Sequence, residues 1–176
     1  GVTQIRLGMK KEGLENYDKG IELSEHAEED IRNKVTLLRS FKFYELAADE
    51  CSKLVERDPG NLYYRFLRGV CYYYAGALRD SLDDFNDVCS QDNSALVAFI
   101  YRARIFLKAE MYEDVAKILK EFEEAETDTD SIKLIRGMYH RYLGNWEEAK
   151  ATLEDILANY DPEDSDLEQI GEVYFH

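Results

Sequence analysis

The chain has 176 residues, 45% of them hydrophobic, so it is long enough to bury most of the surface that its unfolded form exposes. Its 37 acidic and 22 basic residues leave a formal net charge of −15, which repels nucleic acid and anionic membranes. No apolar run approaches the roughly 20 residues that span a bilayer, and the first residues do not resemble a secretory leader. We therefore expect a soluble protein that neither binds nucleic acid nor inserts into membranes. The three cysteines, an odd number with no C-x-x-C spacing, indicate an intracellular and cytoplasmic compartment.

Helix-forming patterns run through the whole chain. Apolar residues recur three and four positions apart, as in Ala47, Cys51 and Leu54, and no sustained alternation of apolar and polar residues occurs. Only two prolines, Pro59 and Pro162, interrupt these patterns. The sequence therefore predicts an all-α fold.

The first predicted element covers residues 7–23, where Leu14, Tyr17 and Ile21 share one helix face. The last covers residues 164–176. The first element follows the second-helix pattern of the blocks between them, and the last follows their first-helix pattern. Each end of the chain is therefore predicted to lie inside a helical hairpin.

The blocks in between repeat one pattern with a period of 34 residues. A small residue marks the first helix of each block and recurs once more after the last block; these residues are Val35, Gly69, Ala103, Gly137 and Gly171. A bulkier residue marks the second helix; these residues are Cys51, Phe85, Leu119 and Leu153. Small residues let two helices approach, and bulky residues fill the adjacent space. Each block is therefore predicted to be a pair of antiparallel helices.

Turn residues stand at the edges of the helices. The segment Asp58-Pro59-Gly60 ends one helix, and Asn61 is placed to cap the next. Gly76 and Gly144 stand where the first helix of a hairpin ends, a position that favours the left-handed conformation.

These blocks resemble tetratricopeptide repeats. The clearest copy runs from Gly137 through Trp146 and Ala149 to Pro162, whereas block 96–129 lacks a closing proline and His140 occupies a slot that is usually aromatic. The resemblance implies a right-handed α-α superhelix, a solenoid of antiparallel helical hairpins, in a single domain over residues 1–176. Its parts would be a partial repeat at 1–27, full repeats at 28–61, 62–95, 96–129 and 130–163, and a partial repeat or capping helix at 164–176.

The resemblance also implies where a partner would bind. In this family the first helices line a concave groove that holds an extended peptide or a helix of another protein. Carried over position by position, the groove residues would be Tyr63, Phe66, Leu67, Val70, Tyr73, Tyr74, Val97, Ile100, Tyr101, Arg104, Lys108, Leu134, Met138 and Arg141. The alternative is that several of these side chains pack against neighbouring hairpins.

Some members of the family hold the C-terminal carboxylate of chaperones with lysine, asparagine and arginine on these inner faces. The corresponding slots here include Tyr63, Phe66 and Ile100, so that carboxylate clamp is missing. An apolar, aromatic groove suits an amphipathic helix or an extended segment with large side chains.

A basic residue precedes the small residue of every block. These residues are Lys34, Arg68, Arg102 and Arg136. They suggest a stripe for an acidic ligand, but a structural use is favoured, because a long basic side chain can lay its stem on apolar surface and keep its head in water.

Residues suited to catalysis or metal binding do not cluster in the sequence. The cysteines Cys51, Cys71 and Cys89 are not in a C-x-x-C spacing and are expected to be buried and reduced. The histidines are far apart, and no phosphate-binding, nucleophile-elbow or calcium-loop motif occurs. We predict no catalytic residue, metal or cofactor.

The sequence thus predicts a non-enzymatic scaffold or adaptor that binds a peptide or amphipathic helix in its groove, as part of a longer repeat protein. The alternatives are a structural spacer in a large assembly and a co-chaperone that lacks the carboxylate clamp. Self-association through the incomplete terminal repeats stays open.

Overall fold

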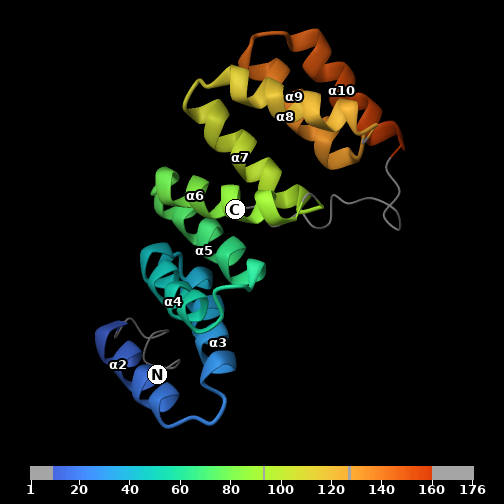
Figure 1. Ribbon diagram of the computed structural model, residues 1–176. Helices are drawn as coiled ribbons and strands as arrows, with labels where there is room; N and C mark the ends of the chain where they lie inside the picture. The colour runs from blue at the N-terminus through green and yellow to red at the C-terminus, as the bar shows by residue number, and fades with distance from the viewer. Residues whose placement is uncertain (1–9, 93, 127, 160–176) are drawn as a thin grey trace. The chain divides into compact units, whose positions relative to one another are not determined.

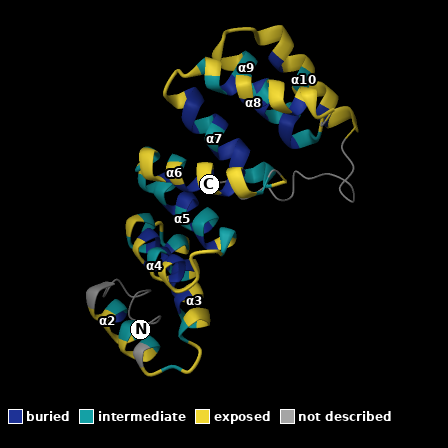
Figure 2. Cartoon of the chain, in the orientation of Figure 1, coloured by how far each residue is buried: buried dark blue, intermediate teal, exposed yellow. Residues whose placement is uncertain are grey.

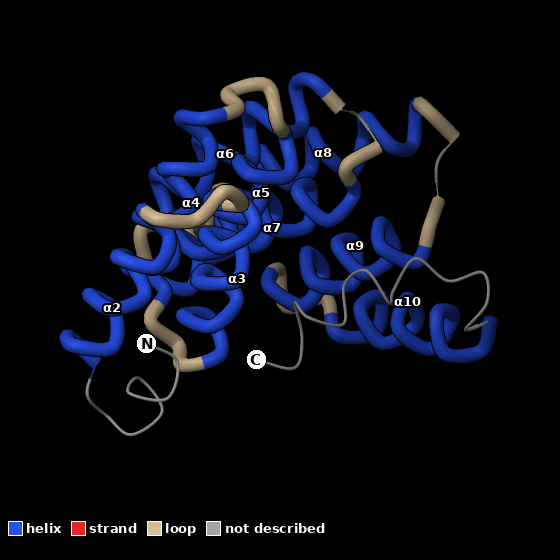
Figure 3. The backbone as a smooth tube through the Cα atoms, turned by 90° about the horizontal axis from the view of Figure 1, so that it is seen from below, coloured by secondary structure: helices blue, strands red, loops and turns tan. Residues whose placement is uncertain are grey.

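The computed structural model describes residues 10–92, 94–126 and 128–159, and all regular structure in these ranges is α-helical (Figures 1 and 3). The helices are α2 (Lys10–Glu22), α3 (Ala27–Ser40), α4 (Tyr44–Arg57), α5 (Leu62–Ala75), α6 (Leu78–Gln91), α7 (Leu96–Lys108), α8 (Tyr112–Glu124), α9 (Asp130–Tyr142) and α10 (Trp146–Asn159). The prediction of an all-α fold is confirmed.

The helices alternate with the predicted period. Helices α4, α6, α8 and α10 begin at Tyr44, Leu78, Tyr112 and Trp146, each 34 residues after the one before. Helices α3, α5, α7 and α9 precede them as the first helices of four hairpins. Helix α2 covers most of the segment predicted as the first element, and the helix expected over residues 164–176 lies outside the described residues.

One residue in each hairpin turn is left-handed. These residues are Lys42 (φ 59°), Gly76 (φ 85°), Glu110 (φ 58°) and Gly144 (φ 79°), again 34 positions apart. After each of them, the next N–H donates to the carbonyl five residues earlier at 2.8 to 2.9 Å, the bond that closes a Schellman motif. The two glycines were predicted from the sequence. The lysine and the glutamate were not, and a side chain in this conformation costs about 1 kcal/mol or more.

The chain divides into two compact units, one up to Asp84 and one from Phe85. In the first unit, α4 packs between α3 and α5 around a buried core that includes Leu38, Leu54 and Cys71, and Leu14 of α2 packs against this core (Figure 2).

In the second unit, α7 contacts both α8 and α9, and α9 pairs closely with α10. The Phe99 and Phe122 rings meet edge to face with centroids 5.0 Å apart, and Ile100, Val115 and Ile135 are buried. Each unit therefore has an apolar interior made by helix pairs.

The small-residue slot is tight but has room for a methyl group. Ala103 is fully buried in this slot. A Cβ built on Gly137 would lie 3.7 Å from Thr152 Cγ2 and 3.8 Å from the Leu153 side chain, which is ordinary contact. At Gly137 a side chain as large as leucine would collide with Thr152 and Leu153, whereas the slot of the first hairpin holds the buried Val35, so the slot restricts size more than it requires glycine.

Candidate partner-binding surface

In the first unit, burial divides the predicted groove residues of α5. Tyr63 is 58% exposed, and Phe66 and Tyr74 are half-buried. The other predicted residues of this helix are buried, namely Leu67, Val70 and Tyr73. Leu67 belongs to the core around Cys71. A partner can therefore reach Tyr63 and parts of Phe66 and Tyr74 without any rearrangement of the core.

In the second unit, Ile100 and Tyr101 of α7 are buried, and the Tyr101 ring stacks on Phe85 with centroids 4.9 Å apart and 12° between the planes. The remaining predicted residues are half-buried or exposed, namely Val97, Arg104, Lys108, Leu134, Met138 and Arg141. The Arg104 guanidinium lies 6.0 Å from the centroid of the Tyr101 ring on the same helix, so the Arg104 side chain lies along α7. The accessible part of this surface is mixed apolar and basic.

The basic residues in front of the small slots make ion pairs inside the first unit. Lys34 is buried between Asp18 and Glu50, with its Nζ 2.7 Å from Glu50 Oε1. Arg68 donates from Nε and Nη2 to the two carboxylate oxygens of Asp84, at 2.8 and 2.6 Å. These two cations hold helices together and do not form a stripe that is open to an acidic ligand.

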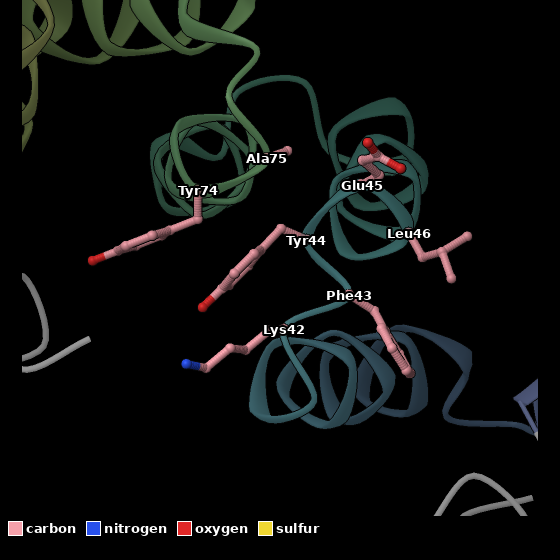
Figure 4. A pocket seen from close by; sticks show the side chains of 7 residues that line it. All are labelled: Lys42, Phe43, Tyr44, Glu45, Leu46, Tyr74 and Ala75. Atoms are coloured by element: carbon pink, nitrogen blue, oxygen red, sulfur yellow. The ribbon is translucent and has the colours of Figure 1, made fainter. Parts of the chain in front are cut away.

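An open pocket of about 310 Å³ lies beside the turn between α3 and α4 (Figure 4). Its lining residues are Lys42, Phe43, Tyr44, Glu45, Leu46, Tyr74 and Ala75. The rings of Tyr44 and Tyr74 are stacked, with centroids 5.1 Å apart and 25° between the planes. Sequence reasoning selected Tyr74 but missed Lys42. No glycine marks this turn in the sequence, and the signal that could have identified Lys42 is the repeat period, because Lys42 stands 34 residues before Gly76.

The cysteines are free and buried. A hydrogen bond with Cys71, together with burial, raises the pKa of the Cys51 thiol, and burial raises the pKa of Cys89. Cys51 and Cys89 are therefore protonated at neutral pH, whereas a nucleophilic cysteine needs a thiolate.

In the described ranges, no three histidine, cysteine, aspartate or glutamate side chains are grouped so that they could hold a metal ion. None of the helices described is both long and apolar enough to cross a membrane.

The helices and turns above define an all-α helical-repeat protein. No protein-family model matches the chain, and no curated protein matches it in sequence. Among solved structures, a tetratricopeptide repeat protein from Parabacteroides merdae is similar, with a TM-score of 0.62 and 18% sequence identity. The match covers 91% of this chain and 63% of that one. The chain therefore has the tetratricopeptide repeat fold, and it spans less than two thirds of the length of this neighbour.

Proposed function

We propose that the chain is a non-enzymatic scaffold that binds an extended peptide or an amphipathic helix of another protein through the accessible residues of its first helices. The observation that carries this proposal is the exposure of Tyr63, 58%, on a helix where Tyr64 and Leu67 are buried. Exposed tyrosines supply contact area and a hydroxyl partner at low entropic cost. Three free, buried cysteines suit a reducing compartment such as the cytoplasm.

The second unit offers the same kind of surface for such a partner. Leu134 and Met138 of α9 are half-buried, and Arg141 on the next turn is exposed. These three residues are spaced as neighbours on one helix face. Apolar side chains beside a cation suit an amphipathic segment that carries both apolar and acidic residues.

A structural role in a longer assembly is the second candidate, and α10 supports it. Trp146, Leu153 and Leu157 share one face of α10 and are 65%, 43% and 77% exposed. The equivalent residues of α4, three repeat periods earlier, are covered by the helix that follows. Tyr44, which corresponds to Trp146, stacks on Tyr74 of α5, and Cys51, which corresponds to Leu153, is buried. The face of α10 is thus of the kind that a further helix covers, whether that helix comes from residues 164–176, from a longer chain or from a second copy.

Selection from a phage-displayed library of random peptides tests the proposed function. Of the predicted groove tyrosines, Tyr73 and Tyr101 are unsuitable for testing binding by substitution, because both are buried and alanine there would remove core contacts. Tyr63→Ala is the better variant, and Trp146→Ala is its matched control, an exposed aromatic on a second helix.

The proposal predicts selected peptides whose binding is lost in Tyr63→Ala and kept in Trp146→Ala. If no peptide is enriched over an empty support, the scaffold function is wrong. Peptides that depend on Trp146 and not on Tyr63 would favour the assembly role.

A further inference from the structure

The turn between α3 and α4 keeps a lysine where the backbone favours glycine. Lys42 has φ 59°, and the equivalent positions of the other turns hold Gly76, Gly144 and Glu110, the last with φ 58°. A side chain held in this conformation strains the backbone, and such strain is common at functional sites. The Lys42 side chain is exposed and lines the pocket of about 310 Å³.

The tyrosines of this pocket are held in place by packing. Tyr74 stacks on Tyr44 on one side, and the buried Tyr73 meets it edge to face, with centroids 5.4 Å apart and 87° between the planes. In Figure 4 the ammonium of Lys42 and the hydroxyls of Tyr44 and Tyr74 point to the same side, whereas the Glu45 carboxylate points away from them. The ammonium of Lys42 and the phenol hydroxyls of Tyr44 and Tyr74 thus lie on one side of the pocket.

We propose that Lys42, Tyr44 and Tyr74 bind a carboxylate of the peptide partner. This inference rests on the proposed function and specifies the anchor group of the partner. The lysine ammonium supplies the charge, and the phenol hydroxyls donate to the carboxylate oxygens. One cation matches one negative charge, and a protein with a net charge of −15 disfavours a doubly charged phosphate more strongly than a carboxylate.

The position of this site differs from that of a carboxylate clamp on the inner faces of first helices. Lys42 is a turn residue, Tyr44 is the first residue of a second helix, and Tyr74 lies in the last turn of the next first helix. All three belong to the first unit, so the site depends on the packing of α4 against α5.

Four short synthetic peptides, each acetylated at its N-terminus, test the proposal by NMR with ¹³C-labelled tyrosine rings. The first has a central glutamate and an amidated end, and the second replaces the glutamate with glutamine. The third has glutamine and a free C-terminal carboxylate, and the fourth has phosphoserine and an amidated end. We expect the glutamate peptide to shift the Tyr44 and Tyr74 signals and the neutral peptide to leave them in place. The third peptide shows whether a chain end also supplies the carboxylate.

Lys42→Gly and Tyr44→Phe should each weaken binding of the glutamate peptide about tenfold, the loss expected for a hydrogen bond to a charged group. Glu110→Gly is the matched control, because it removes the same backbone strain at the equivalent turn and should leave binding unchanged. Equal binding of the glutamate and glutamine peptides, tighter binding of the phosphoserine peptide, or equal affinity in Lys42→Gly would overturn the proposal.

The outcomes separate this inference from the proposed function. Library peptides that require Tyr63 but are insensitive to Lys42→Gly would overturn the carboxylate site alone. A library that yields no peptide would overturn the scaffold function, whatever the glutamate peptide does.

Discussion

The two units hold the basic residue in front of the small slot in different ways. In the first unit, Lys34 pairs with Glu50 and Arg68 with Asp84, and in both cases the carboxylate stands 16 residues later, on the second helix of the hairpin. The ion pairs therefore connect the two helices of a hairpin at a fixed position of the repeat.

In the second unit, Ile118 and Thr152 occupy the position of the carboxylate. Arg102 instead lies over the Phe99 ring, 5.3 Å from its centroid, and hydrogen-bonds to Cys89, while its buried Nε meets no hydrogen-bond acceptor among the described residues. Arg136 pairs with Asp128, at 3.1 Å, in the loop before its own helix. The partner of the repeated cation thus depends on the residue 16 positions later, and we expect the same slot to stabilise the two units to different degrees.

The largest expected effect comes from removal of the cation in each unit. Arg68→Met leaves the Asp84 carboxylate, whose side chain is only 5% exposed, without its partner, and should cost about 3 to 5 kcal/mol. Arg102→Met strands no carboxylate and should cost about 1 kcal/mol or less, the worth of its contact with the ring. Urea unfolding followed by circular dichroism measures both.

The double variant Arg68→Met with Asp84→Leu tests whether the stranded carboxylate causes the loss. It should recover most of the lost stability, because an apolar pair can replace a buried ion pair at little cost. Equal losses in Arg68→Met and Arg102→Met would show that the ion pair does not distinguish the two units.

The small slot predicts a smaller effect than the loss of the ion pair. Gly137→Leu should lower the free energy of unfolding by about 1 to 3 kcal/mol, because its branches collide with Thr152 and Leu153. Gly137→Ala should raise it by up to about 1 kcal/mol, because the methyl group fits and alanine favours helix. Thermal melts of both variants, with Ala103→Gly as the reverse change, measure these differences in stability. A loss in Gly137→Ala would mean that the slot excludes any side chain.

The left-handed turns predict the smallest effect. Lys42→Gly in the first unit and Glu110→Gly in the second should each stabilise the chain by about 1 kcal/mol, because glycine adopts a positive φ without strain. Gly76→Ala should destabilise it by a similar amount. Denaturant midpoints measure these changes, and a loss of stability in either lysine or glutamate variant would contradict the turn geometry.

Much of the fold could be predicted from the sequence because local rules determine it. The period of the small residues located both helices of each hairpin, and Gly76 and Gly144 marked two of the four turns correctly. Lys42 and Glu110 gave no such signal, since the turn there is set by the hydrogen bonds that end the helix and not by the residue type.

The candidate surface was less predictable, because exposure depends on contacts between helices that are distant in sequence. Tyr63 and Leu67 are neighbours on one face of α5, yet one is exposed and the other belongs to the core. The residue types next to Tyr63 and Leu67 in the sequence do not show which of the two is exposed. The ion pairs were available to sequence reasoning, since an acidic residue 16 positions after the cation occurs only in the hairpins where the pair forms.

The most direct test of the account compares these two neighbours. Leu67→Ala should lower the free energy of unfolding by about 2 to 5 kcal/mol, whereas Tyr63→Ala should change it by about 0.5 kcal/mol or less. The measurement is the affinity of a library-selected peptide for the Tyr63→Ala protein, taken together with the free energy of unfolding of that protein. We expect a tenfold or larger loss of affinity, about 1.4 kcal/mol, at unchanged stability. Full affinity in a folded Tyr63→Ala protein would contradict it.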